Sequence, residues 1–99
     1  MLQNTGIREI VIEEICKLAE KYNLQKVILF GSRARGDYKR TSDIDLATQG
    51  GNYARFALDV DETTSTLLKF DIVNLDGVVQ DELRESIRKE GKILYEKIW

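Results

Sequence analysis

Apolar residues recur at three- and four-residue steps near the start of the chain. Over residues 5–22 this spacing predicts an amphipathic helix with one buried face, and Asn23 is a suitable residue to end it. The apolar positions of this helix are Ile7, Ile10, Val11, Ile15, Leu18, Ala19 and Tyr22.

Three later segments have the composition of β-strands. Lys26–Phe30 is a continuous β-branched, aliphatic and aromatic run that ends at Gly31, which is typical of a strand buried on both faces. Residues 43–48 and 69–75 are the other two predicted strands. All three are bounded by polar or glycine-containing segments that favour turns.

Two further helices and one short helical turn are predicted. The short turn covers residues 32–36. Residues 53–68 alternate apolar and polar side chains at helical spacing, although β-branched threonines weaken the second half. Residues 78–90 place three apolar side chains on one face. The tail, residues 92–99, fits either an edge strand or a last helical turn, because its periodicity is compatible with both.

The order of these elements predicts an α/β fold, also described as α+β, in which helices pack on a small mixed β-sheet of three to four strands. A right-handed crossover would make the strands at 43–48 and 69–75 parallel neighbours. The strand at 26–30 is then most simply antiparallel to the strand at 43–48. One end of this sheet would gather Ser32, Asp43, Asp45 and Asp71.

Composition narrows the function. The chain has 99 residues, and we expect a single domain over residues 1–99. The absence of histidine excludes Ser–His and Cys–His catalysis and histidine-ligated zinc. Cys16, the single cysteine, is expected to be a core residue. A net charge of −2 argues against a broad nucleic-acid-binding surface. Without a long apolar run or a secretory signal, we expect a cytoplasmic protein with no membrane contact.

A glycine-serine pair follows the first predicted strand. Gly31 lacks a Cβ, which permits a sharp turn and lets a phosphate approach the backbone closely. Ser32 offers a hydroxyl and a backbone N–H at the start of a helical segment, an arrangement that favours anions. Four basic residues follow, namely Arg33, Arg35, Lys39 and Arg40. Each of them either contacts phosphate or belongs to the solvated surface.

Two acids stand one residue apart in the predicted strand at 43–48. Asp43 and Asp45 would point to the same side of the sheet. Asp71 lies in another apolar strand, where an unpaired charge is costly. An isolated Asp-x-Asp pair is more often a turn followed by a salt-bridged strand end, but its context here predicts a site for divalent cations. Because neighbouring carboxylates repel, at least one should have a raised pKa.

These motifs carry a resemblance to a known family. Gly31-Ser32-Arg33-Ala34-Arg35-Gly36, then Ser42-Asp43-Ile44-Asp45-Leu46, then the acid Asp71, resemble the minimal nucleotidyltransferase (MNT) branch of the DNA polymerase beta-like nucleotidyltransferases. The resemblance implies transfer of a nucleoside monophosphate with release of pyrophosphate. ATP is the expected donor, and another nucleoside triphosphate is left open. Two Mg²⁺ ions are the expected cofactor.

The resemblance also assigns roles to residues. The implied catalytic and Mg²⁺-binding residues are Asp43, Asp45 and Asp71. The implied nucleotide-binding residues are Gly31, Ser32, Arg33 and Arg35. In this family the minimal members resemble antitoxins paired with a HEPN-type ribonuclease toxin, and some adenylylate a tyrosine of that partner. We therefore expect an antitoxin with protein adenylyltransferase activity.

Two alternatives stay open at this point. The chain could instead be an antitoxin that acts by stoichiometric binding without catalysis, or a regulatory module that binds nucleotide without releasing pyrophosphate. Ile98 and Trp99 either complete the core or anchor a partner, because large apolar and aromatic residues are enriched at interfaces. The oligomeric state is not fixed by the sequence, and a homo-oligomer is left open.

Overall fold

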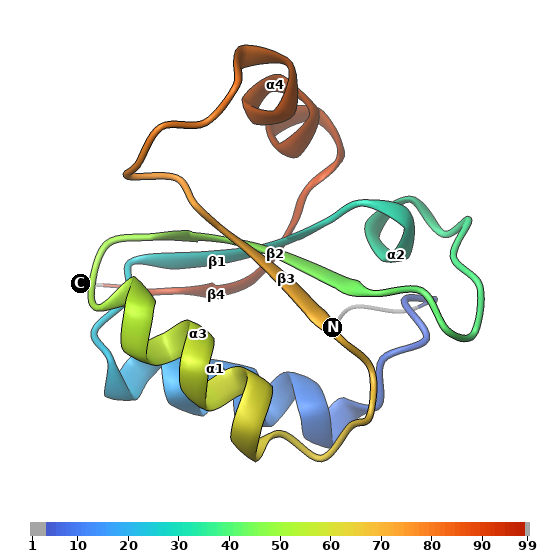
Figure 1. Cartoon of the computed structure of the whole chain (residues 1–99), viewed down its shortest axis with the longest axis horizontal. Helices are drawn as coiled ribbons and strands as arrows, with labels where there is room; N and C mark the ends of the chain where they lie inside the picture. The colour runs from blue at the N-terminus through green and yellow to red at the C-terminus, as the bar shows by residue number, and fades with distance from the viewer. Residues whose placement is uncertain (1–3, 99) are drawn as a thin grey trace.

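The computed structural model describes residues 4–98 and shows four helices and four strands within them. In chain order these are α1 (Glu9–Lys21), β1 (Lys26–Phe30), α2 (Ser32–Arg35), β2 (Ile44–Gln49), α3 (Tyr53–Thr63), β3 (Phe70–Asn74), α4 (Asp81–Glu90) and β4 (Lys92–Glu96). The strands form one mixed sheet in the order β3-β2-β1-β4 (Figure 1).

The strand directions confirm the predicted fold. β1 is antiparallel to β2, and β2 is parallel to β3. The tail forms β4, an edge strand antiparallel to β1, which decides between the two predictions for that segment. In this arrangement β1 ends where β2 and β3 begin. The chain after β1 and the chain before β2 and β3 therefore meet at one end of the sheet.

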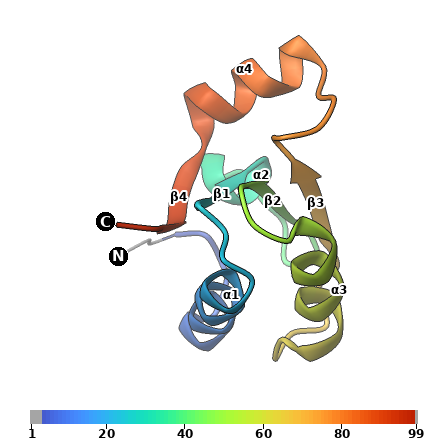
Figure 2. The ribbon, with the colours of Figure 1, turned by 90° about the vertical axis from the view of Figure 1, so that its left-hand side faces the viewer.

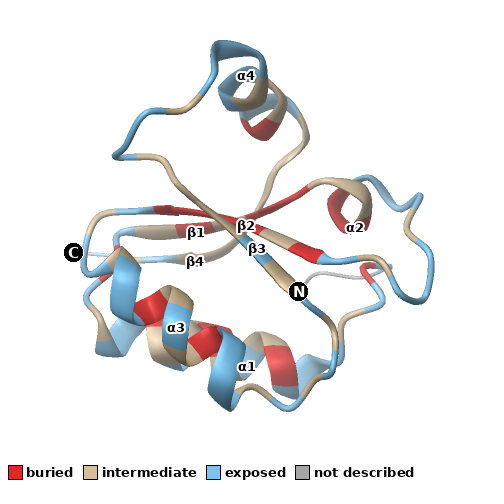
Figure 3. Ribbon diagram, viewed as in Figure 1, coloured by how far each residue is buried: buried red, intermediate tan, exposed pale blue. Residues whose placement is uncertain are grey.

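Helices cover both faces of the sheet. Figure 2 shows α1 and α3 on one side and α4 on the other. The larger apolar cluster lies under α1 and α3, and includes Ile15, Leu29, Leu46 and Phe56, each 0% exposed. The cluster under α4 is small and has Phe30, Ala47 and Ile87 as its buried members. Figure 3 shows this difference as more buried ribbon along α1 and α3 than along α4.

Three helix ends differ from the sequence-based expectation. α1 begins at Glu9 instead of residue 5, because Gly6 has a positive φ of 69° and the hydroxyl of Thr5 accepts the N–H of Ile7. α3 ends at Thr63 instead of residue 68. There the hydroxyls of Thr63 and Thr64 donate back to carbonyls one turn earlier, which competes with continued helix.

The last helix also starts later than predicted. α4 begins at Asp81 instead of residue 78, after Gln80 in an extended conformation. Val78 is fully exposed at 107%, so the apolar residues before Asp81 do not all belong to a buried helix face. β2 begins at Ile44, which leaves Asp43 just outside the strand.

Candidate functional site

Asp45 and Asp71 are cross-strand neighbours on β2 and β3. Asp45 precedes Ala47 by two residues, and Asp71 precedes Val73 by two; both of these apolar residues belong to the cluster under α4. Alternate residues of a strand share a face, so the two acids lie on the α4 face of the sheet. They stand at the end where the parallel strands begin. The prediction that Asp45 and Asp71 lie at the same end of the sheet is therefore confirmed.

Asp43 lies in the exposed segment that leads into β2. The hydroxyl of Ser42 accepts the N–H of Lys39 at 2.8 Å, and the N–H of Ser42 donates to the carbonyl of Lys39 at 3.0 Å. These bonds define a tight turn immediately before Asp43. Its charge reaches Asp45, because it is one of the groups that shift the Asp45 pKa.

The electrostatics of Asp45 fit the prediction of mutually repelling acids. Partial burial, then the charges of Asp71 and Asp43, raise the pKa of Asp45 from 3.8 to about 6. Arg35 and Arg33 oppose this shift without cancelling it. The site therefore carries an excess of negative potential that a cation would relieve.

Gly31 turns the chain directly beside Asp45. Its φ of 74° and ψ of −156° belong to a region that residues with a Cβ rarely adopt. A Cβ placed on Gly31 would overlap the Asp45 carboxylate oxygen. The glycine thus does two things: it makes the turn from β1 into α2 and leaves room for Asp45.

Ser32 and Arg35 lie on the short helix that follows this turn. Ser32 is the first residue of α2 and is half-buried. Arg35 is exposed, with its Nε 3.2 Å from an Asp37 carboxylate oxygen and 3.7 Å from a Glu90 carboxylate oxygen. Arg35 therefore links α2 to the end of α4 while remaining accessible. Both residues stay candidates for contact with phosphate.

Arg33 has a different position from the one expected of a nucleotide-binding residue. It is 1% exposed, and its guanidinium donates to four backbone carbonyls and lies over the ring of Tyr38 at 4.8 Å. The carbonyls belong to Thr5, Lys39, Arg40 and Ser42. With its donors used in this way, Arg33 fixes the turn before Asp43 and is not available to phosphate.

Sequence reasoning missed the partners of Arg33. Tyr38 and the buried Thr5, 2% exposed, carry no motif that would single them out. Their roles depend on the fold, which brings the segment before α1 against the loop before β2. Lys39 and Arg40 contribute backbone carbonyls here, and both side chains are exposed.

The donor chemistry of the three acids suits Mg²⁺, which prefers carboxylate oxygens. Among residues 4–98, however, no three His, Cys, Asp or Glu side chains converge closely enough to form a ready-made metal centre. The expected closed trio is therefore not assembled: Asp45 and Asp71 are adjacent, and Asp43 stands before the strand.

Two other predicted features lie away from the acids. Cys16 is half-buried, its thiol donates to the carbonyl of Leu94 at 3.3 Å, and burial raises its pKa, which suits a structural residue.

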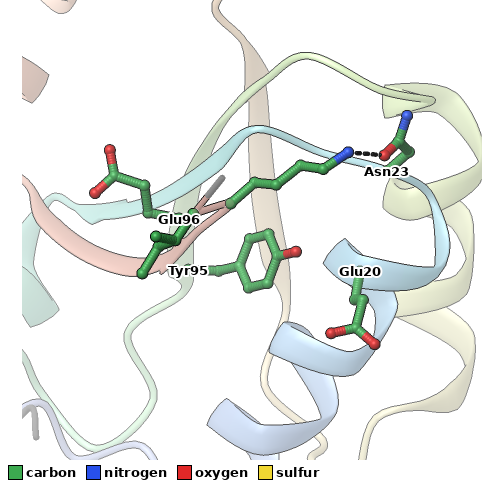
Figure 4. A pocket seen from close by; sticks show the side chains of 6 residues that line it. Glu20, Asn23, Tyr95 and Glu96 are labelled. Atoms are coloured by element: carbon green, nitrogen blue, oxygen red, sulfur yellow. Dashed lines mark hydrogen bonds between the residues drawn. The ribbon is translucent and has the colours of Figure 1, made fainter.

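Ile98 is 87% exposed and lines a hollow of about 510 Å³ with Glu20 and Tyr95 (Figure 4). In that hollow the Lys97 ammonium donates to the side chain of Asn23.

This hollow lies at the end of β1 opposite Gly31, because Lys26 pairs with Glu96 there. It is separate from the acidic site. Trp99, the other half of the predicted terminal anchor, lies outside the described residues. The anchor stays a prediction. In residues 4–98 no helix combines the length and apolar character that a membrane crossing requires.

Comparisons with known proteins agree with the fold described above. The family described as "Polymerase beta, Nucleotidyltransferase" matches residues 13–98. A Methanocaldococcus jannaschii protein named "Putative protein adenylyltransferase" is 35% identical over 95 residues, covering 84% of this chain and 92% of its own length.

Solved structures show the same fold. A crystal structure of a toxin–antitoxin with AMP-PNP matches with a TM-score of 0.71 and 26% identity, over 87% of this chain and 73% of that one. A Shewanella oneidensis complex of a tri-AMPylated HEPN toxin with an MNT antitoxin matches with a TM-score of 0.67 and 21% identity, over 92% of this chain and 74% of that one. The chain belongs to the polymerase beta nucleotidyltransferase family and is an enzyme of the nucleotidyltransferase class.

Proposed function

We propose that the protein transfers AMP from ATP to a hydroxyl of a partner protein. The observation that carries this proposal is the pairing of Asp45 with Asp71 on adjacent parallel strands, beside the Gly31 turn, in a chain of this family. Burial, and then the charges of Asp71 and Asp43, raise the pKa of Asp45 to about 6, and a cation bound there would favour its charged form.

Each part of the site has a task in this reaction. The Gly31–Ser32 turn lets the triphosphate approach the backbone, and exposed Arg35 offers it a positive charge. Asp43, Asp45 and Asp71 would hold two Mg²⁺ ions. Metal bound there would lower the pKa of the attacking hydroxyl and neutralise charge on the leaving group. Buried Arg33 keeps the turn before Asp43 in place.

The proposed transfer forms one bond and breaks one bond. The acceptor oxygen forms a bond to the α-phosphorus, and the bond from that phosphorus to the oxygen shared with the β-phosphate breaks. Pyrophosphate leaves, and the hydroxyl proton passes to solvent. Attacking and leaving oxygens stand roughly in line in such reactions, so the acceptor oxygen must approach the α-phosphorus from the side opposite the departing pyrophosphate.

For the partner we propose a HEPN-type ribonuclease toxin, and for the acceptor a tyrosine hydroxyl. Support comes from the structural neighbours, which include a toxin–antitoxin with AMP-PNP and a complex of an AMPylated HEPN toxin with an MNT antitoxin. In this role the chain would act as a cytoplasmic antitoxin that modifies its partner.

Label transfer from ATP tests this proposal. The protein is incubated with a candidate HEPN-type partner protein, Mg²⁺, and ATP labelled at either the α or the γ phosphate. We expect α label on the partner and release of pyrophosphate, both lost in Asp71→Asn and kept in Glu13→Gln, an exposed acid of α1.

Two outcomes would contradict the proposal. Transfer of γ label would indicate a kinase. Inhibition of the partner with no transferred label and no pyrophosphate would indicate an antitoxin that acts by stoichiometric binding alone.

A further inference from the structure

Two loops lie against each other at the acidic end of the sheet. One leads into β2 and the other, residues 64–69, leads into β3. The N–H of Ile44 donates to the carbonyl of Lys69 at 2.8 Å, which fixes the loops side by side. Between them is a hollow of about 510 Å³, which we call the loop hollow; its lining residues are Thr41, Asp43, Leu67, Leu68 and Lys69.

The lining of the loop hollow combines an apolar wall with two opposite charges. Leu67 is fully exposed at 103%, whereas Leu68 is partly buried against the main core. Lys69 is exposed and forms no salt bridge with any residue of the described range 4–98. Asp43 is one of the three acids of the proposed catalytic site. A ligand in the hollow would thus contact apolar surface and an acid together.

The position of the loop hollow relative to Gly31 is set by the strand order. β2 stands between β3 and β1, so the loop before β3 lies on one side of Asp45 and the Gly31–Ser32 turn lies on the other. A triphosphate on the Gly31 side would leave the β3 side open. An in-line reaction requires the attacking oxygen on that open side.

A second hollow lies close to the loop hollow in the chain, between α3 and β3. Phe70 follows Lys69 in the chain and lines this second hollow of about 410 Å³ together with Tyr53, Ala57, Leu58, Asp61 and Ile72. Leu58 is 50% exposed. Exposed apolar side chains before β3 and on α3 suit a protein partner better than a small free acceptor.

We propose that the loop hollow binds the acceptor as a tyrosine side chain of the partner protein, with its ring against Leu67 and its hydroxyl toward Asp43. Lys69 then provides a positive charge in the wall beside an oxygen that loses its proton as it attacks the α-phosphorus. This inference rests on the proposed function, and it adds the acceptor-binding residues to it. The second hollow would receive apolar residues that flank the tyrosine.

Binding of a tyrosine probe tests the assignment without requiring activity. N-acetyl-tyrosinamide is titrated into the full chain while amide NMR signals are followed, in the wild type, Leu67→Asp and Val78→Asp. Val78 is the matched control, because it is equally exposed in a loop but lies past the opposite end of β3. We expect signals of Thr41 and residues 67–69 to shift, and Leu67→Asp to weaken binding about tenfold, because it places a charge against the ring.

The outcomes separate this inference from the proposed function. If Leu67→Asp and Val78→Asp bind the probe equally, or if AMP-PNP with Mg²⁺ shifts the loop-hollow signals and the tyrosine probe does not, the inference is wrong. Failure of AMP-PNP with Mg²⁺ to shift Gly31, Ser32 and Asp45 would count against the proposed function instead. In the label-transfer assay we expect Leu67→Asp to raise the KM for the partner and leave the KM for ATP unchanged.

Discussion

The surroundings of Asp45 disfavour the charged form of its carboxylate. Its folded-state pKa of about 6 lies above the ordinary value of 3.8, because of burial and the charges of Asp71 and Asp43. The folded protein therefore takes up a proton at Asp45 more readily than the unfolded chain does. With no metal bound, this group makes the fold more stable as the pH falls from about 7 to about 4.

Asp45→Asn should for this reason leave the metal-free protein at least as stable as the wild type. A shift of this size corresponds to roughly 3 kcal/mol for a buried group, and solvent screening of this half-exposed one reduces the expected gain at pH 7 to about 1 kcal/mol. Chemical denaturation at pH 7 and near pH 4 measures it, and the gain should vanish at the lower pH. A variant less stable than the wild type at pH 7 would contradict the assignment.

Gly31 is required both by its backbone angles and by the space it leaves. Gly31→Ala should cost roughly 1–3 kcal/mol of stability, because of its backbone region, and should greatly reduce transfer because the new Cβ displaces the Asp45 carboxylate. Gly36→Ala is the matched control: Gly36 also has a positive φ, of 94°, but a Cβ there would meet nothing within 4 Å. Denaturation should show a loss in both variants. Equal loss of transfer in both would refute the role of the Asp45 contact.

Arg33 and Arg35 are two residues apart and should behave in opposite ways. Arg33→Met leaves four carbonyls without their donor and should destabilise the protein by about 3 kcal/mol. Arg35→Met removes only exposed ion pairs and should change stability by less than about 1 kcal/mol, while raising the KM for ATP. Denaturation and steady-state kinetics on the pair decide; the reverse pattern would exchange the two roles.

The residue types of the candidate site were predictable from the sequence, but the contacts that each side chain makes were not. Asp-x-Asp, the glycine-serine pair and Asp71 stand out because each is costly or unusual in an apolar strand context. Arg33 and Arg35 look alike in the sequence. Only the fold, which buries Arg33 among Thr5, Tyr38 and the loop before β2, separates a structural arginine from an accessible one.

At the scale of elements, strands were predicted better than helix ends. β1 has the predicted bounds, because a continuous apolar run ended by glycine leaves few alternatives. The start of α1 and the end of α3 depend on side-chain hydrogen bonds from threonines, which compete locally with helix. Periodicity does not register such competition, so those bounds were off by several residues.

α4 is attached to the sheet by few residues, and it covers the same face that carries the acids. Ile87, 3% exposed, is the one residue of this helix that is fully buried, and it packs in the cluster of Phe30 and Ala47. Ile87→Ala should cost about 2–4 kcal/mol. Hydrogen exchange should speed up in α4 more than in α1. Uniform acceleration across both helices would show that α4 does not open independently.

At the scale of the whole molecule, the topology makes the site. Asp45 and Asp71 become neighbours only because β2 and β3 are parallel and joined through α3, and Gly31 reaches them only because β1 runs antiparallel to β2. The sequence order of strands and helices was enough to predict this convergence. It did not reveal that Asp43 lies one residue before β2, or that the described residues contain no closed cluster of three acids.

The most direct measurement is the anomalous scattering of Mn²⁺ in crystals of the protein grown with AMP-PNP. We expect manganese between the carboxylates of Asp45 and Asp71, with Asp43 drawn in as a further ligand and the nucleotide phosphates on the Gly31–Ser32 turn. Manganese bound elsewhere, or phosphates bound at that turn while the three carboxylates remain apart without metal, would contradict the account.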